Sequence, residues 1–308
     1  MARVRSAIGF LAGALAVGMA LGLFSGGPVL AQETALERIA RTGQFRVGMR
    51  EDAAPFAYID ESGQHVGFSV DMAYLLAEKL GEYAGRPIEV IPVTVTPQTR
   101  IPLVVNGTID IEMGSTSKTA ARQLQVDFSL PFFVSETVFM VRADSGITTL
   151  SDLTGKAVGA ASGTTNLKAL RENIEAGVFN PSNVVVVDTH SRGVLALRTG
   201  RVDAYFTDAS LLVGLRGVSP NPAELEIIYE AIHSEPYGWL IPKGDATFRD
   251  FVDHFIIWTL ETGIFYEIYD KWMGPGSRTP IPRSSEYEAL LKGIQWPGVT
   301  EVWPRPPR

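Results

Sequence analysis

The sequence predicts an α/β fold of two lobes, each a mostly parallel sheet flanked by helices, with two hinge strands joining the lobes. Three observations carry this prediction. A short helix, a glycine and a β-run recur three times in that order. Other strand-like and helix-like runs alternate between these repeats, as they do in parallel sheets. Two extended apolar segments, each next to turn residues, have the form of crossings between lobes.

The helix–glycine–strand repeats give the first elements. In each repeat the glycine is placed to end the helix, because glycine adopts the left-handed conformation of a helix C-cap at little cost. The repeats pair helices with strands at 36–43 and 45–49, 103–107 and 109–113, and 195–200 and 202–206. The intervening runs predict helices at 68–80 and 165–173 and strands at 88–95, 157–161 and 184–187.

The two crossings divide the chain. The segment 138–141 is apolar and runs into turn residues, and the segment 231–240 contains Pro236 and Gly238 before an apolar return. We therefore expect lobe 1 at 32–141 plus 233–275, with lobe 2 inserted at 142–232. Amphipathic helices at 248–258 and 263–272 would complete lobe 1. A Pro-rich extension would follow at 276–308, with one helix at 285–294.

The first 31 residues have the form of a secretory signal peptide. Arg3 and Arg5 precede an uncharged apolar stretch at 8–24, and small or apolar residues lead to a cleavage site after Ala31. The alternative is a membrane anchor, for which this stretch is short and weakly apolar. We therefore expect the protein in a bacterial periplasm.

Composition argues against several classes of function. The formal net charge is −7, and loss of Arg3 and Arg5 with the signal peptide makes it −9, so nucleic acid is not expected as a partner. The chain has no cysteine, which excludes a disulfide framework and a cysteine nucleophile. Its four histidines lack ligand spacing, and no P-loop or dinucleotide fingerprint is present. We expect neither a metal nor a cofactor.

The run at 106–122, NGTIDIEMGSTSKTAAR, is the most informative part of the chain. It predicts a helix end, a buried strand, a turn of small and hydroxyl residues, and a helix start near Arg122. Ligands in open α/β sheets bind beyond the carboxyl ends of strands. The turn at Ser115 and Ser117, with the fork-shaped guanidinium of Arg122, suits a carboxylate. The alternative is an ordinary strand–helix turn with an exposed arginine.

Other polar residues follow strands of both lobes. Arg50 and Arg100 come after strands of lobe 1, and His190, Asp208 and the turn at 162–165 come after strands of lobe 2. Taken singly, each arginine is more often a solvated charge, His190 a structural histidine and Asp208 a helix N-cap. Their shared position favours a site. Three arginines and a histidine against one aspartate suggest a ligand with two carboxylates and one ammonium, because every buried charge must be paired.

At these residues the chain resembles the periplasmic glutamate/aspartate-binding proteins of ABC amino-acid importers, within the polar-amino-acid solute-binding proteins. The resemblance covers nearly all of 34–275. It implies a two-lobed periplasmic-binding-protein fold of type II, an acidic or polar L-amino acid as ligand, the membrane permease of an ABC importer as partner, and a monomer. The motifs that carry it are VGMREDAAPFAY at 47–58, TRIPLVVNGTIDIEMGSTS at 99–117, ASGTTN at 161–166 and YFTDASLL at 205–212.

The resemblance also implies a role for each site residue. The α-carboxylate of the ligand would pair with Arg122, helped by Ser117, Thr164 and Thr165. The α-ammonium would be held by Asp208 and the Ser115 carbonyl. The side-chain carboxylate would be held by Arg50, Arg100 and His190.

Two positions depart from the family pattern. Pro97 stands where the family often has a hydroxyl residue, three positions before Arg100. Ser117 stands where threonine is common. The first departure removes one possible side-chain contact, so it loosens the preference for glutamate over aspartate and for acids over their amides.

The alternative to a binding protein is an enzyme. Some relatives with this fold are dehydratases of prephenate- or arogenate-like dicarboxylates, a reaction that needs a general acid without a salt-bridge partner. Glu112 and Glu136 are candidates, although both are more readily surface or lobe-edge residues. A G-x-S-x-G hydrolase motif is absent. A sensory module would need an attached membrane or signalling segment, and none is recognised, so we expect a binding protein and no enzyme.

Overall fold

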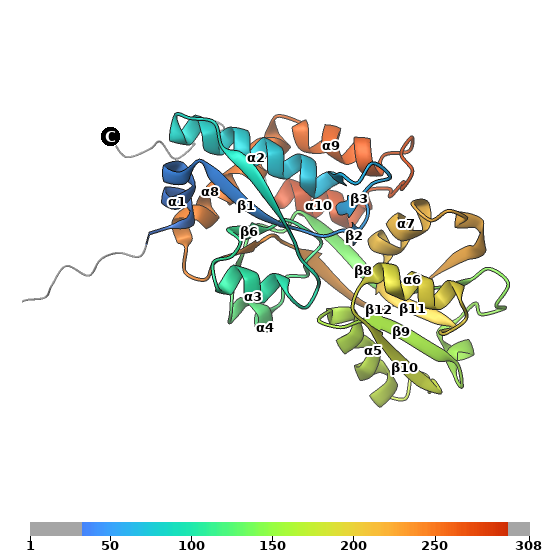
Figure 1. Cartoon of the computed structure of the whole chain (residues 1–308). Helices are drawn as coiled ribbons and strands as arrows, with labels where there is room; N and C mark the ends of the chain where they lie inside the picture. Colours follow the sequence, from blue (N-terminus) through green and yellow to red (C-terminus); the bar gives the residue numbers. More distant parts are fainter. Residues whose placement is uncertain (1–32, 295–308) are drawn as a thin grey trace, which may run out of the picture. The chain divides into compact units, whose positions relative to one another are not determined.

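The computed structural model describes residues 33–294. The predicted signal peptide at 1–31 and the end of the extension at 295–308 lie outside the described residues. Two five-stranded sheets organise the chain, and a small sheet of β2 (Asp52–Ala53), β3 (Ala57–Ile59) and β4 (His65–Val66) adjoins the first (Figure 1). Within 33–294, no helix is long and apolar enough to cross a membrane.

The first sheet has the strand order β5-β1-β6-β13-β7. Strands β1, β5, β6 and β7 run in one direction, and β13 alone is reversed. The strands are β1 (Gln44–Met49), β5 (Glu89–Thr94), β6 (Ile111–Glu112), β7 (Asp127–Phe128) and β13 (Leu240–Ile241). The helices of this lobe are α1 (Ala35–Thr42), α2 (Phe68–Ala84), α3 (Arg100–Val105), α4 (Ala120–Gln123), α8 (Ala246–Glu261) and α9 (Ile264–Met273).

The second sheet has the order β10-β9-β11-β8-β12, and β8 is its only reversed strand. The strands are β8 (Phe133–Arg142), β9 (Ala157–Ala161), β10 (Asn183–Val187), β11 (Ala204–Asp208) and β12 (Leu225–Tyr237). The helices are α5 (Thr165–Glu175), α6 (His190–Arg198) and α7 (Ala209–Gly217), with 3-10 turns at Leu150–Leu153 and Pro222–Glu224. The prediction of two mostly parallel sheets flanked by helices is confirmed.

The three helix–glycine–strand repeats are confirmed as well. They are α1 to β1, α3 to β6 and α6 to β11, and Gly43, Gly107 and Gly200 between them have φ values of 73°, 72° and 72°. Positive φ is strained for residues with a side chain, which is why glycine ends these helices. The strand expected at 109–113 is shorter than expected, since only Ile111–Glu112 pairs in the sheet.

Strands β8 and β12 form the passage between the lobes. They pair antiparallel from Phe133 opposite Tyr237 to Arg142 opposite Leu225, with one irregularity in register. Both predicted crossings fall on or next to these strands. Strand β8 pairs within the second sheet from its first residue, Phe133, which lies before the predicted lobe boundary at 142. That boundary therefore stays a prediction.

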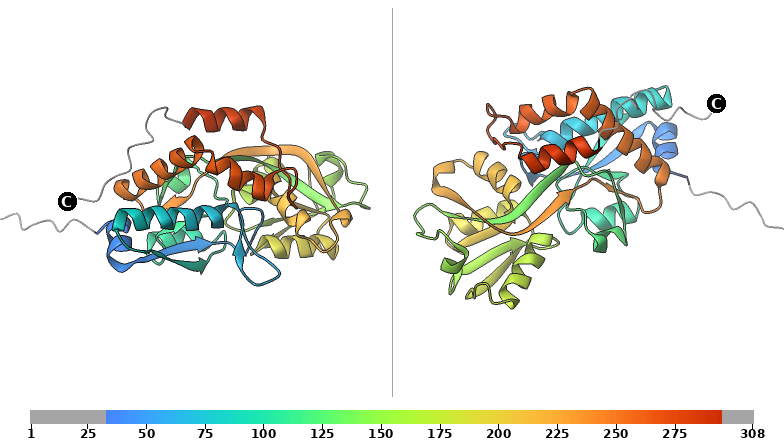
Figure 2. Two further views of the ribbon diagram at one scale, coloured as in Figure 1. Left: turned by 90° about the horizontal axis from the view of Figure 1, so that it is seen from above. Right: turned by 180° about the vertical axis from the view of Figure 1, so that it is seen from behind.

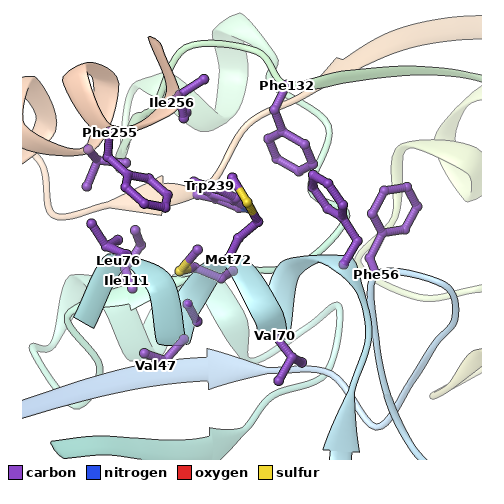
Figure 3. Close-up of a cluster of buried hydrophobic side chains, with 14 of the residues drawn as sticks. Val47, Phe56, Val70, Met72, Leu76, Ile111, Phe132, Trp239, Phe255 and Ile256 are labelled. Carbon is purple, nitrogen blue, oxygen red and sulfur yellow. The ribbon is translucent and has the colours of Figure 1, made fainter. Parts of the chain in front are cut away.

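The core of the first lobe lies between α2, α8 and the sheet (Figure 3). Val47 and Ile111 reach it from the sheet, Leu76 from α2 and Phe255 from α8. Phe56 is fully buried in the same cluster, where it packs against Phe133. This packing fixes the strands whose ends carry the polar residues described below.

The predicted helix of the extension is confirmed as α10 (Ser285–Ile294). It lies near α9 (Figure 2). The Tyr287 ring packs at a tilt of 36° against the Tyr269 ring, with the ring centroids 5.9 Å apart, and its hydroxyl donates to the Phe132 carbonyl at 2.9 Å. The extension as far as Ile294 is therefore part of the first lobe's packing.

Candidate functional site

The predicted polar residues lie at the carboxyl ends of strands in both sheets. Arg50 follows β1, Arg100 begins α3 beyond β5, and Arg122 lies in α4 beyond β6. In the second lobe His190 begins α6 beyond β10, and Asp208 ends β11. Each of these five side chains is at most 8% exposed. They are therefore not solvated surface charges. For the arginines, this rules out the interpretation that each one favoured when it was considered alone.

Arg50 is linked to the second lobe through Asp52. The Arg50 Nη2 donates to Asp52 Oδ1 at 2.6 Å, and Asp52 Oδ2 accepts from the Ser191 backbone N–H at 3.2 Å. Burial opposes ionisation of Asp52, but the charge of Arg50 and the Ser191 N–H help to lower the pKa of this carboxyl. Ser191 lies in the first turn of α6, where the helix dipole also favours an anion. A carboxylate of lobe 1 thus bridges to a helix of lobe 2.

Arg100 is linked to Glu112 through a hydroxyl. Its Nη1 donates to Thr116 Oγ1 at 2.5 Å, and that hydroxyl donates to Glu112 Oε2 at 2.7 Å. Burial lowers the pKa of Arg100 to about 9, which leaves the guanidinium charged at neutral pH. Burial also raises the pKa of Glu112, although Arg100 and the Thr116 hydroxyl act in the opposite sense.

The expectation that Glu112 is a surface or lobe-edge residue is wrong. Its side chain is 0% exposed, because β6 is the central strand of the first sheet. The sequence around it did not distinguish a central strand from an edge strand. Glu136, the other candidate acid, is exposed as expected.

Arg122 connects turns of both lobes. Its Nη1 donates to the Ser117 carbonyl at 2.7 Å and its Nη2 to the Gly163 carbonyl at 3.1 Å. Beside it, the hydroxyls of Ser117 and Thr165 lie 3.2 Å apart. A Cβ at Gly163 would lie 2.7 Å from the Pro97 carbonyl oxygen, so a glycine is needed where these turns approach. Burial lowers the pKa of Arg122.

His190 is a buried residue with one defined partner. Its Nδ1 lies 2.9 Å from the Tyr205 hydroxyl. Burial, reinforced by the charge of Arg50, lowers the pKa of His190 to about 3. The imidazole is therefore neutral at ordinary pH, and it contributes a hydrogen-bonding group to the site instead of a charge.

Asp208 stands at the N-cap of α7, the structural alternative that the sequence left open. Its side chain nevertheless makes no capping hydrogen bond. The carboxylate Oδ1 accepts from Asn166 Nδ2 at 2.8 Å. Burial raises the pKa of Asp208, opposed by hydrogen bonds from Tyr237 and Asn166. A buried carboxylate that does not cap its helix is available to a cation.

The hydroxyl residues of the site differ in which of their polar groups remain available to a ligand. Thr164 caps α5, since its hydroxyl accepts from the Leu167 N–H at 3.1 Å and donates to the Ala161 carbonyl at 2.6 Å. Its backbone N–H is therefore the group that it can offer a ligand. The buried Ser115 hydroxyl has no protein partner.

Sequence reasoning missed four residues that complete these networks, namely Asp52, Thr116, Asn166 and Tyr205. All four stand in motifs that carry the resemblance, and Asp52 lies two positions after Arg50, so a weak signal existed for each. For Asp52 the decisive contact is with Ser191, which is distant in sequence. No local pattern announces such a contact.

Several buried polar atoms of the site lack a hydrogen-bond partner within the protein. They are Arg50 Nε, Arg100 Nε, Ser115 Oγ, Ser162 Oγ and Glu112 Oε1. Eight more such atoms are scattered over the rest of the described residues, so the lack of a partner is not by itself a mark of a site. The five matter because they belong to residues at the strand ends described above, and donors and acceptors left open there suit a small polar ligand. No cluster able to hold a metal ion occurs in the described part of the chain.

Comparison with known proteins places these residues in context. Residues 45–275 match the family model described as bacterial extracellular solute-binding proteins, family 3. The L-glutamate/L-aspartate-binding protein of Pseudomonas aeruginosa is 34% identical, with 86% of this chain and 90% of that protein covered. The glutamate/aspartate import solute-binding protein of Salmonella typhimurium is 33% identical, with 90% and 94% covered.

A solved structure extends the comparison. It is an ancestral amino-acid-binding protein, described as a precursor of cyclohexadienyl dehydratase. The two chains are 27% identical, with a TM-score of 0.68, and the match covers 78% of this chain and 99% of that one. The two-lobed fold is therefore shared over nearly the whole length of that protein.

Proposed function

The chain belongs to the bacterial extracellular solute-binding proteins of family 3, and on that premise we propose that it captures acidic L-amino acids, glutamate and aspartate, between its two lobes. The observation that carries this proposal is the group of three buried arginines at strand ends, with donors on Arg50 and Arg100 that no protein atom satisfies. Arginine forks suit carboxylates. The printed names of the two curated relatives point to the same ligands.

The two ends of such a ligand have different candidate partners. Arg122, with Ser117, Thr165 and the Thr164 N–H, would hold the α-carboxylate. The Asp208 carboxylate and the Ser115 carbonyl would hold the α-ammonium. The remaining residues would hold the side-chain carboxylate, namely Arg50, Arg100 and His190. The contacts between lobes at Arg122 and Asp52 support a ligand enclosed by both.

The proposal extends to the protein's setting. The closed, ligand-bound protein would deliver its ligand to the membrane permease of an ABC importer, acting as a monomer in the periplasm after cleavage following Ala31. Lobe 1 would comprise 32–141 and 233–275, lobe 2 would comprise 142–232, and the extension would begin at 276. Because a ligand shifts a conformational equilibrium only by its preference for one state, the open form would predominate without ligand.

Titration calorimetry on the mature chain tests the proposal. The protein is unfolded and refolded to remove co-purified ligand, then titrated with L-glutamate, L-aspartate, L-glutamine and L-asparagine. Tight binding of the two acids with weak binding of the amides is expected. Equal binding of acids and amides would make the protein a broad polar-amino-acid receptor, and no binding of any of them would contradict the proposal.

A dehydratase is a second candidate because of one observation. Glu112 is a fully buried acid with a raised pKa and an oxygen without a partner, which is what a general acid requires. The solved relative described as a precursor of a dehydratase shares the fold. Incubation with a prephenate- or arogenate-like dicarboxylate decides between the two candidates, since only an enzyme would produce measurable turnover.

A further inference from the structure

The ionisable groups of the site balance one another before any ligand is considered. Three arginines, Arg50, Arg100 and Arg122, face three carboxylates, Asp52, Glu112 and Asp208. His190 is neutral because burial lowers its pKa to about 3. Burial raises the pKa of Glu112 and of Asp208, so at a pH where all three carboxylates are ionised the site has no net charge.

One more carboxylate, that of Glu235 on β12, acts on Arg122. Its Oε1 lies 3.0 Å from His233 Nε2, and the side chains of Glu235 and His233 are 12% and 44% exposed. Because its nearest partner is an imidazole open to solvent, Glu235 is left out of the buried balance.

The net charge of the occupied site depends on whether the ligand is neutral or acidic. Glutamine carries one ammonium and one carboxylate, so a buried glutamine leaves the site neutral. Glutamate and aspartate carry a second carboxylate and would leave one uncompensated negative charge. Enclosing an unpaired charge is strongly unfavourable, because the charge loses its solvation without gaining a partner. A proton taken up with the ligand removes this cost.

We propose that an acidic amino acid binds together with one proton, and that Glu112 is the residue that carries it. This inference rests on the proposed function, since it concerns the same site and the same ligands. It makes Glu112 a specificity-determining residue, because the proton compensates the second carboxylate. Neutral polar amino acids bind without proton uptake.

The geometry of Glu112 suits this role. Its Oε2 accepts from the Thr116 hydroxyl, which in turn accepts from Arg100 Nη1. Its Oε1 is buried and has no partner. A proton on Oε1 therefore leaves the existing chain of hydrogen bonds intact and adds a donor to the site. A Cβ at Gly114 would lie 2.3 Å from this oxygen, so the glycine leaves room beside it.

The other acids suit the role less well. Asp52 is held by Arg50 and the Ser191 N–H, and its pKa is lowered. Asp208 has a raised pKa, but in the proposed complex it faces the ligand ammonium, which favours the ionised form. The groups that act on Glu112 are Arg100, Arg50 and Arg122 with the Thr116 hydroxyl, and burial outweighs them and raises its pKa.

Calorimetry in paired buffers of different ionisation enthalpy measures the number of protons exchanged. The full mature chain is titrated with glutamate and with glutamine between about pH 5.5 and about pH 9. We expect proton uptake with glutamate to approach one at some pH in this range, and none with glutamine. Where the proton uptake is close to one, the affinity for glutamate should fall about tenfold for each unit of rising pH, because one proton is linked to binding.

Two variants locate the proton. Glu112→Gln keeps the shape of the side chain, carries no titrating group, and should abolish both the proton uptake and the pH dependence of glutamate binding. Glu136→Gln removes an exposed carboxylate outside the site and should leave both unchanged.

The outcomes separate this inference from the proposed function. Glutamate binding with no proton uptake at any pH would overturn the inference and leave the proposed function standing. Uptake that persists in Glu112→Gln would overturn the assignment to Glu112. If neither acids nor amides bind at all, the proposed function fails and the inference fails with it. If Glu112→Gln does not fold, the paired-buffer measurement on the unaltered protein still decides whether a proton is taken up.

Discussion

At the scale of single residues, each arginine of the site has a different set of partners. Arg122 holds backbone carbonyls of both lobes, Arg50 holds a carboxylate, and Arg100 holds a hydroxyl. Backbone carbonyls are present whatever the ligand's side chain is. The arrangement therefore suggests that Arg122 serves all amino-acid ligands, whereas Arg50 and Arg100 discriminate among their side chains.

Removal of Arg122 should abolish amino-acid binding. Arg122→Ala would leave the α-carboxylate unpaired in a buried site, at a cost of about 3–5 kcal/mol. We expect glutamate and glutamine to be lost alike in calorimetry. Because Arg122 also holds the Ser117 carbonyl, urea unfolding of the variant is the control for folding. A variant that folds and still binds glutamine would contradict the assigned role.

Removal of Arg100 should change selectivity. Arg100→Ala takes away a charged donor to the side-chain carboxylate, worth about 1.5–3 kcal/mol, that an amide would use less fully. The affinity ratio of glutamate to glutamine should therefore fall by about tenfold or more. An equal loss of both ligands would show that Arg100 does not distinguish them.

At the scale of elements, two helix starts with the same residue type serve different purposes. Asp245 caps α8 by accepting from the Phe248 N–H at 3.0 Å. Asp208 occupies the same position on α7, but its carboxylate turns to Asn166. Helix α7 thus lacks a side-chain cap at the position where a buried carboxylate is proposed to hold a ligand.

The contrast predicts opposite effects for two substitutions. Asp208→Asn should lower the affinity for all amino acids by about a hundredfold or more, because the ammonium loses its charged partner. The free energy of unfolding should stay level or rise, since burial raises the pKa of Asp208 and the ionised form is therefore disfavoured in the folded protein.

Asp245→Ala is the matched control. It removes a cap that is used and an acceptor for the Ala35 N–H, so it should cost about 1 kcal/mol of stability or more while binding stays unchanged. Urea unfolding and calorimetry on both variants provide the measurements. A stable Asp208→Asn protein with undiminished affinity would contradict the role proposed for Asp208.

The elements also show what could be predicted from the sequence. Helix ends at Gly43, Gly107 and Gly200 were predictable because the signal is local, a single residue that tolerates positive φ. The burial of Glu112 was not predictable, because it depends on β13 and β7 completing the sheet beyond β6. Arg50 and Arg122 could be placed at strand ends, but the contact of Arg122 with Gly163 and that of Asp52 with Ser191 join residues distant in sequence.

At the scale of the whole molecule, three polar contacts between the lobes lie at the site. Asp52 accepts from the Ser191 N–H, Arg122 donates to the Gly163 carbonyl, and Ser117 approaches Thr165. Two of these three contacts involve residues that are also proposed to touch the ligand. Asp52 differs, because its carboxylate is already used by Arg50 and by the start of α6. It is therefore the residue on which closure can be tested apart from ligand contact.

Substitution of Asp52 should weaken the closed state for every ligand. Asp52→Ala removes a charged acceptor from the Ser191 N–H, worth about 1.5–3 kcal/mol, so dissociation should become about tenfold faster or more. Association should change little, since ligands first meet the open form. Asp52→Asn keeps an acceptor without the charge and should show a smaller effect, whereas Glu51→Gln, at an exposed neighbour, should show none. Stopped-flow measurements with glutamate and glutamine distinguish the possible mechanisms: equal acceleration of both dissociation rates indicates a role in closure, whereas a change for glutamate alone would mean that Asp52 acts through Arg50 on the side-chain carboxylate.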